Sequence, residues 1–268
     1  MIIIFNDSFN FNEKTIPKTI LGNAPFIAEP YFGHRTRLYD IDLHKNPESI
    51  ANIIKTSYDL GVKSINLVND SALLEAYDIA SNNGCKMDVV ASIGKHFGID
   101  YMIPDFVKAK EVDWQNDIDV LSSYNPDIML VDEFLVDGYD WDLTSEILEK
   151  INETNSFAGL ITNFPIKTTG LILENLDLEL FEFYMVPINK LGYMMDSPMF
   201  IGSKREEFEN NLKKLNKKVI ASKVLACGIL MPQEAFNFIN SLDYIDLITV
   251  GIASENEAKT DFNMLFDI

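Results

Sequence analysis

The sequence predicts a single (β/α)8 barrel, the TIM-barrel architecture of the α/β class, from its length and from a repeated pattern of segments. The chain has 268 residues, which suits one α/β barrel of ~250 residues. Eight apolar, strand-like runs alternate with stretches that carry apolar residues at helical spacing. Successive runs start about 31 positions apart, close to the ~30-residue βαβ unit. No strand-like run is followed by the G-x-G-x-x-G turn that is typical of a doubly wound sheet.

The strand candidates are nearly continuous in apolar, β-branched or aromatic residues, as in a parallel sheet that helices cover on its outer face. They begin near Phe26, Lys63, Met87, Asp127, Phe157, Phe181, Lys218 and Tyr244. We expect residues 1–23 to form an N-terminal extension, a short strand or hairpin across the bottom of the barrel. We expect residues 24–268 to form the barrel as one domain.

The helical stretches between these runs carry recognisable start and stop signals. Asn46 and Pro47 suit the N-cap and the first turn of a helix that ends at Gly61. Ser254 with Glu257 three positions later forms a capping box, which predicts the start of the last helix.

Composition narrows the class of function. With 22 basic and 41 acidic residues the net charge is −19, which argues against nucleic acid and anionic membranes as partners. Two cysteines are too few for a disulfide framework. No window approaches the ~20 apolar residues of a membrane helix, and the apolar start is too short for a signal peptide. We therefore expect a cytoplasmic protein that acts on a small molecule.

Active sites of such barrels lie where the strands end and in the loops that follow. The loop after the first predicted strand carries His34, Arg35 and Arg37 in an otherwise acidic chain. Guanidinium groups bind carboxylate or phosphate through two parallel hydrogen bonds, so this loop predicts a small anionic or phosphorylated substrate. Pairing with nearby surface aspartates is the structural alternative.

Two further strand ends carry candidate catalytic groups. Lys95 and His96 follow the third strand between two glycines, where they suit proton transfer or the polarisation of a carbonyl. Lys223 lies in the apolar seventh strand, where burial could prepare it as a base or nucleophile. The structural alternatives are a solvated glycine loop and a lysine that reaches out to solvent. The other polar residues at strand ends are Glu29 and Glu133 as acid–base candidates, Asn189 as a substrate ligand, and Asn66, Asp132, Thr162 and Asn163.

Two further patterns concern metal binding and the residues that could cover the site. The three histidines lie in separate loops without metal-ligand spacing, so we expect no metal. The apolar residues at 193–195 and 199–200, after the sixth strand, are candidates for a lid over the site or for a contact in a homo-oligomer. Packing against their own helix is equally compatible with the pattern.

Three segments, 51–66, 219–230 and 249–258, resemble the aldo/keto reductase superfamily and together contain 38 of the 268 residues. The resemblance implies a (β/α)8 barrel, NADPH as cofactor and carbonyl reduction by a set of Asp, Tyr, Lys and His. It also implies that Gly228, Gly251 and Ser254 lie on the cofactor side. Asn66 stands where the aspartate of that set falls. The strand that carries the catalytic histidine in that family ends here in two acids, Asp132 and Glu133. The resemblance is therefore to a diverged member.

Three functions follow from these patterns. The first is a barrel enzyme with isomerase- or lyase-like acid–base chemistry on a small anionic metabolite. The second is an NADPH-dependent oxidoreductase of the aldo/keto reductase type with a diverged site. The third is a binding protein that keeps the barrel without catalysis.

Overall fold

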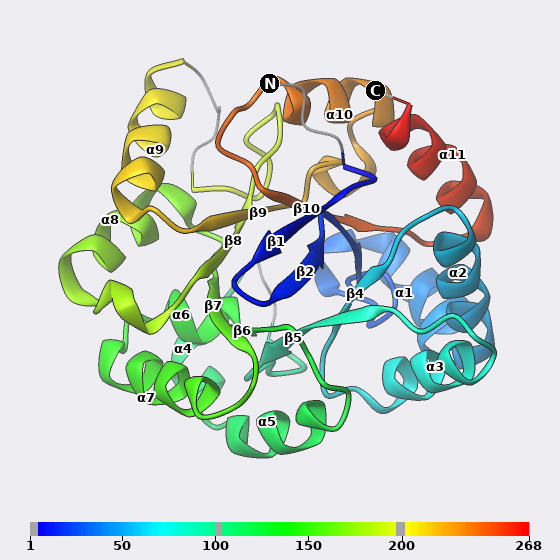
Figure 1. Ribbon diagram of the computed structural model, residues 1–268, viewed down its shortest axis with the longest axis horizontal. Coiled ribbons are helices and arrows are strands. Elements are labelled where there is room, and N and C mark those ends of the chain that lie inside the picture. Colours follow the sequence, from blue (N-terminus) through cyan, green and yellow to red (C-terminus); the bar gives the residue numbers. More distant parts are fainter. Residues whose placement is uncertain (1–4, 100–102, 197–201, 268) are drawn as a thin grey trace.

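The computed structural model describes residues 5–99, 103–196 and 202–267. Eight parallel strands form a closed barrel, and helices surround it (Figure 1). The barrel strands are β3 (Thr19–Gly22), β4 (Ser64–Leu67), β5 (Asp88–Ile93), β6 (Ile128–Val131), β7 (Phe157–Ile161), β8 (Phe183–Pro187), β9 (Lys218–Ser222) and β10 (Leu247–Gly251). The last strand pairs with the first, with Gly251 opposite Gly22. This pairing closes the sheet and confirms the predicted (β/α)8 barrel.

Helices follow the strands along the chain, and the longer ones cover the outer face of the barrel (Figure 1). They are α1 (His34–Tyr39), α2 (Pro47–Asp59), α3 (Ser71–Asn82), α4 (Phe106–Ala109), α5 (Trp114–Ser122), α6 (Glu133–Val136), α7 (Trp141–Asn152), α8 (Pro165–Asn175), α9 (Gly202–Leu215), α10 (Pro232–Asn240) and α11 (Glu255–Phe266). The predicted caps are present, because the side chain of Asn46 accepts from the backbone of Ser49 and that of Ser254 accepts from the backbone of Glu257.

Seven of the eight strands begin within three positions of the predicted starts, and the first does not. The run that begins at Phe26 is a turn, since the N–H groups of Phe26 and Ile27 both donate to the carbonyl oxygen of Asn23. The first barrel strand is β3, which is fully buried and lies inside the segment 1–23 that was expected to be an extension. The prediction was wrong because Phe26 and Ile27 are apolar for another reason: they anchor a loop in the core.

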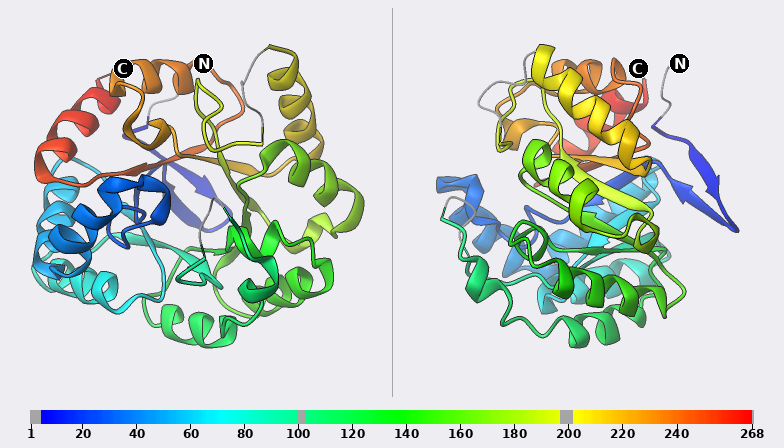
Figure 2. Two further views of the ribbon diagram at one scale, coloured as in Figure 1. Left: turned by 180° about the vertical axis from the view of Figure 1, so that it is seen from behind. Right: turned by 90° about the vertical axis from the view of Figure 1, so that its left-hand side faces the viewer.

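The N-terminal hairpin covers the bottom of the barrel. Its strands β1 (Ser8–Phe11) and β2 (Lys14–Pro17) pair antiparallel. The ring of Phe11 packs edge-on against Phe157 at 4.9 Å and against Phe183 at 5.2 Å between centroids. Figure 2 shows the hairpin at one end of the barrel and α1 at the other. The apolar residues inside the barrel are therefore shielded at the end where the strands begin, and the opposite end is left for a site.

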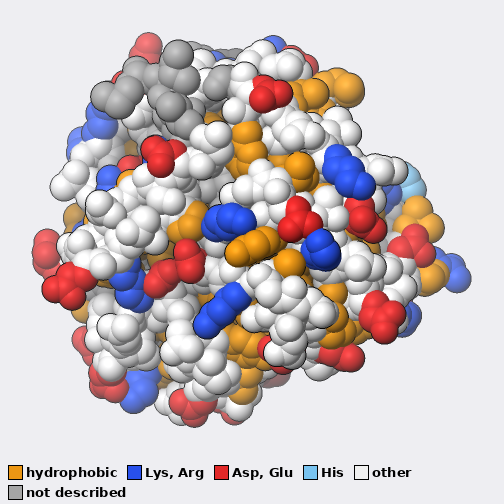
Figure 3. Space-filling view, turned by 45° about the vertical axis from the view of Figure 1, so that its right-hand side comes forward, with side chains coloured by type: hydrophobic (Ala, Val, Ile, Leu, Met, Phe, Trp, Pro, Cys, Tyr) orange, Lys and Arg blue, Asp and Glu red, His pale blue; other side chains and the backbone are white. Residues whose placement is uncertain are grey.

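The surface carries both signs of charge. Acidic and basic side chains are interspersed with apolar ones over the face in Figure 3. The described helices lack the length and apolar character that crossing a membrane requires.

Candidate active site

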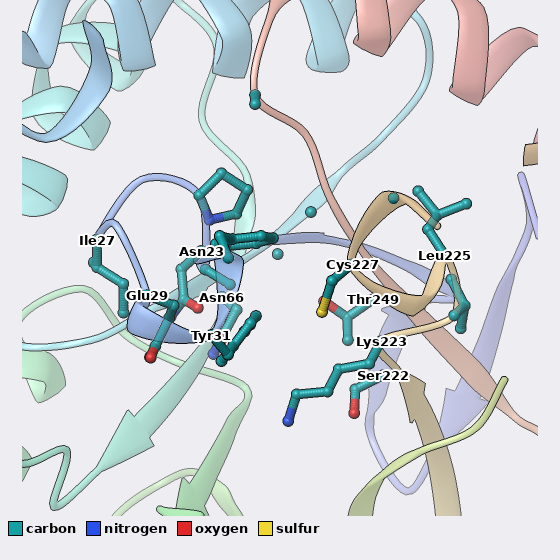
Figure 4. Close-up of a pocket in the computed structure, with 18 of the residues that line it drawn as sticks. Asn23, Ile27, Glu29, Tyr31, Asn66, Ser222, Lys223, Leu225, Cys227 and Thr249 are labelled. Atoms are coloured by element: carbon teal, nitrogen blue, oxygen red, sulfur yellow. The ribbon is translucent and has the colours of Figure 1, made fainter. Parts of the chain in front are cut away.

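A cavity of about 340 Å³ opens at the carboxyl ends of the barrel strands, opposite the hairpin (Figure 4). Its floor consists of strand-end residues, among them Asn66, Ser92 and Ser222. Its walls come from the loop after β3, the loop after β9 and the start of α11. This is the end at which barrel enzymes carry their active sites.

Lys95 lies at the centre of a buried cluster of charged groups. Its ammonium is 2.6 Å from Glu29, 3.5 Å from Glu133 and 3.8 Å from Asp132. Only 9% of Lys95 is exposed. Burial by itself would lower the pKa of Lys95, but the surrounding carboxylates outweigh it and raise that pKa well above its usual value. Lys95 is therefore a permanent ammonium, suited to hold and polarise an oxygen and unsuited to act as a free amine.

The two carboxyl groups at the start of α6 have pKa values shifted in opposite directions. Burial, reinforced by the charge of Glu133, raises the pKa of Asp132 well above its usual value. Burial would also raise the pKa of Glu133, but the charges of Lys95 and Lys223 outweigh it and lower that pKa to about 2. Asp132 is therefore the weaker acid of the pair and Glu133 the stronger. Neighbouring carboxyls whose pKa values are driven apart are typical of acid–base sites.

Lys223 reaches the same cavity from the other side. It follows β9 in a left-handed conformation, with φ of 52°. Its side chain extends into the cavity (Figure 4), where the ammonium donates to Oδ1 of Asn163 and lies 5.4 Å from the centroid of the Tyr31 ring. The Lys223 ammonium thus lies in the same cavity as the Lys95 cluster, and its charge acts on Glu133.

A buried carboxyl holds Asn163 in place. Asp137, at the end of α6, accepts from the backbone N–H of Asn163 at 2.8 Å and from the hydroxyls of Thr162 and Thr168. Only 2% of Asp137 is exposed, and this burial raises its pKa to about 7 in spite of the three donors. The position of Lys223 therefore depends on a network that links α6, the loop after β7 and the loop after β9.

The predicted arginine loop is divided between two roles. Arg35 lines the cavity, and its guanidinium donates to the carbonyl oxygen of Cys227 in the turn after β9. Gly228 permits this contact, because a Cβ there would lie 2.9 Å from Nη1 of Arg35. His34 and Arg37 are exposed on α1 and do not line the cavity. Arg35 thus joins two loops over the cavity through a backbone oxygen.

The remaining predicted site residues have separate positions. Glu29, Glu133, Lys95 and Lys223 line the cavity together with Gly228 and Gly251, whereas His96, Asn189 and Ser254 do not. Asn189 is buried and holds the loop after β8, because its side chain both donates to and accepts from the backbone of Tyr193.

Sequence analysis missed several residues of this region, among them Tyr31, Asp137 and Asp261. Tyr31 belongs to the loop that was taken for the end of a strand. Asp137 lies four positions after Glu133, a spacing that places both on one side of a helical turn and could have indicated it.

The candidate lid residues and the side chains able to bind a metal can be compared with the described residues. Met194 contacts Cys227 through its sulfur atom at 3.3 Å, which brings the loop after β8 to the turn after β9. Positions 199–200 of the expected lid lie outside the described residues. Within the described ranges, no group of three or more His, Cys, Asp or Glu side chains is arranged to hold a metal ion.

Comparison with known proteins supports the fold. Neither a protein-family model nor a curated protein matches the sequence. A solved structure described as a candidate aldo-keto reductase from Pseudomonas aeruginosa is 15% identical, with a TM-score of 0.65 over 98% of this chain and 96% of that one. A mutant of Gox0644 in complex with NADPH is 13% identical, with a TM-score of 0.60 over 97% of this chain and 88% of that one. At these identities the likeness establishes a shared fold, and the chain has the barrel of the aldo-keto reductases.

Proposed function

We propose that this protein is an enzyme that transfers a proton at a carbonyl- or hydroxyl-bearing carbon of a small anionic metabolite. One observation carries the proposal: Asp132 and Glu133, with pKa values driven apart, lie beside the permanent ammonium of Lys95 at the mouth of the barrel. A buried lysine among three carboxyl groups is expensive to desolvate. Its place in a cavity, where a ligand oxygen can reach the ammonium, favours a chemical role over a purely structural one.

The roles follow from position. Lys95 polarises the substrate oxygen and stabilises the negative charge that develops on it when a neighbouring C–H bond loses its proton. Glu29 and Glu133, on either side of Lys95, are the candidate bases. A substrate oxygen bound to Lys95 competes with Glu133, the more distant of the two at 3.5 Å, and so makes Glu133 a better base. Lys223, across the cavity, binds the anionic group of the substrate.

A carbonyl reductase of the aldo-keto type is the second candidate. It is favoured by the fold shared with Gox0644, which was solved in complex with NADPH. The cavity supplies a lysine, a tyrosine and carboxyl groups, but none of the three histidines lines it. A binding protein without catalysis is the third reading, and the carboxyl pair beside Lys95 tells against it.

We propose in addition that the protein is cytoplasmic and that its partner is a small molecule. The acidic composition and the two unpaired cysteines, Cys85 and Cys227, support it. Formation of a homo-oligomer stays a prediction.

Deuterium exchange tests the proposed chemistry without a cofactor. Small keto and hydroxy acids and sugar phosphates would be screened for a rise in melting temperature, since a ligand at 100 Kd stabilises the fold by about 2.7 kcal/mol. Each ligand found would be incubated with the enzyme in D2O, and proton NMR would follow exchange at the carbon next to the carbonyl.

Variants of the two cavity lysines distinguish their proposed roles in proton exchange and in ligand binding. We expect exchange with the wild type and with Lys190→Met, a surface control whose lysine pairs with Glu234. Lys95→Met should abolish exchange, and Lys223→Met should weaken ligand binding. Consumption of NADPH without exchange would replace the proposal by the reductase. Binding without either reaction would favour the non-catalytic protein.

A further inference from the structure

The start of α11 forms one wall of the cavity, and this part of a barrel is where phosphate groups commonly bind. Loops after the seventh and eighth strands and a following helix start present backbone N–H groups to an anion. NADPH, which is bound in a structure of the same fold, carries several phosphate groups. The residues here therefore decide whether such a cofactor can be held.

Two backbone donors at this helix start are already used within the chain. The N–H of Ala253 donates to Oε2 of Glu257 at 2.7 Å, and the N–H of Glu257 donates to the hydroxyl of Ser254 at 3.1 Å. The carboxylate of Glu257 thus lies at the position that an anionic ligand would take. Because Glu257 also lines the cavity, its negative charge faces any ligand that approaches from this side.

A second acid on the same helix strengthens this effect. Asp261 lies one turn after Glu257, lines the cavity and is 7% exposed. Burial, together with the charge of Glu257, raises the pKa of Asp261 to about 6, so that it is mostly ionised at pH 8. Two carboxylates therefore face the part of the cavity where the phosphate groups would have to lie.

The guanidinium of Arg35 is already hydrogen-bonded within the chain. Arg35 lines the cavity. Its charge lowers the pKa of Tyr39 and the charge of Glu257 raises it, so both charges lie near Tyr39 on one side of the cavity. Its guanidinium donates to the carbonyl oxygen of Cys227 and packs on Gly228. A phosphate at α11 would have to remove Arg35 from that contact while displacing Glu257 from Ala253.

We infer that the α11 side of the cavity excludes phosphate groups, that Glu257 stands there in place of a ligand phosphate, and that the chain does not use NADPH. The residues present do not fit that cofactor even though the fold is shared with an NADPH-bound protein. The anionic part of a ligand is then directed to Lys223, which lines the same cavity. The inference concerns only the start of α11 and the turn after β9, and it holds whether or not the Lys95 cluster is catalytic.

NADPH binding to four forms of the full chain tests the inference. The forms are the wild type, Glu257→Ala, the double variant Glu257→Ala with Asp261→Asn, and the control Glu255→Ala. Glu255 is a matched control because it lies in the same first turn of α11, carries the same charge, accepts from Thr56 and does not line the cavity. Binding would be followed by NADPH fluorescence at pH 8, and circular dichroism would confirm that each form is folded.

We expect no saturation of the wild type or of Glu255→Ala by NADPH up to ~1 mM. Removal of one carboxylate next to a phosphate should tighten binding by about tenfold or more, and the double variant should bind best. Glu257→Gln, which keeps an acceptor for Ala253 and removes the charge, is the substitute if Glu257→Ala does not fold.

Three results would overturn the inference. The first is micromolar binding of NADPH by the wild type. The second is an equal gain in Glu255→Ala and Glu257→Ala, because the effect would then be one of net charge. The third is no gain in the double variant, because the two carboxylates would then not be the obstacle.

Discussion

The ammonium of Lys95 lies 2.6 Å from Oε1 of Glu29, and this contact joins the loop after β5 to the loop after β3. The two strands are not neighbours, since β4 lies between them in the sheet. One buried ion pair therefore ties together two separate sides of the barrel mouth. It serves both the stability of the fold and the proposed chemistry, and the two roles can be measured separately.

Loss of Lys95 should destabilise the fold strongly. In Lys95→Met, the carboxylates of Glu29 and Glu133 stay buried without their cation, and we expect a loss of about 3–5 kcal/mol in the free energy of unfolding. Urea denaturation at pH 8 measures it. The control Lys55→Met removes an exposed pair with Asp59 and should lose far less, because solvent screens that pair. Similar losses of free energy in the two variants would show that the buried cluster contributes no more to stability than an exposed ion pair does.

Asp137 should make the stability of the fold depend on pH. Its pKa is raised by burial from 3.8 to about 7 in the folded protein. Between these two values the folded state keeps a proton that the unfolded state has lost. The stabilisation is therefore complete below pH 3.8 and is lost as the pH rises through about 7, by at most about 4 kcal/mol.

Urea denaturation of the wild type and of Asp137→Asn at pH 5 and at pH 8 tests this. The wild type should lose more free energy of unfolding between the two pH values than the variant, which cannot titrate at this position. Other groups, Asp261 among them, contribute equally to both proteins. Equal losses in the two proteins would contradict the assignment.

Gly228 should not tolerate a side chain. Its φ is +79°, and a Cβ would lie 2.9 Å from Nη1 of Arg35. In Gly228→Ala, backbone strain and the displaced guanidinium should together cost about 1–3 kcal/mol in the free energy of unfolding. Gly170→Ala is the matched control, because nothing lies within 4 Å of its Cβ position in helix α8. That control should be stabilised by up to about 1 kcal/mol, and a loss as large as that of Gly228→Ala would be unexpected.

The N-terminal hairpin should contribute to stability as a cover. Phe11 packs against Phe157 and Phe183 at the bottom of the barrel. Because Phe11 is only partly buried, we expect Phe11→Ala to lower the free energy of unfolding by about 1–3 kcal/mol. Phe97→Ala, at a ring that is 46% exposed, should change it by no more than about 0.5 kcal/mol. Thermal denaturation of both variants gives the comparison, and an unchanged Phe11→Ala would mean that the hairpin does not seal the barrel.

The sequence by itself determined the architecture of this protein and most of its strands. Strand periodicity and helix caps are local patterns, which follow from backbone geometry and from burial of one face, so they can be recognised without knowledge of distant contacts. The same physics explains the error at Phe26, where apolar residues form a buried loop instead of a strand. An apolar run indicates burial, and only hydrogen bonding to β4 and β10 identifies Thr19–Gly22 as the strand.

Only the tertiary structure decided which polar residues form the site. The barrel brings Glu29, Lys95 and Glu133 together from three different loops and leaves His96 and Arg37 outside the cavity. Their distances depend on how the sheet closes, which no local pattern records. The pKa values of the site likewise depend on the tertiary structure, because the pKa of a carboxyl depends on its neighbours and its burial. The sequence names Asp132 and Glu133 as two similar acids, and the fold raises the pKa of the first and lowers that of the second.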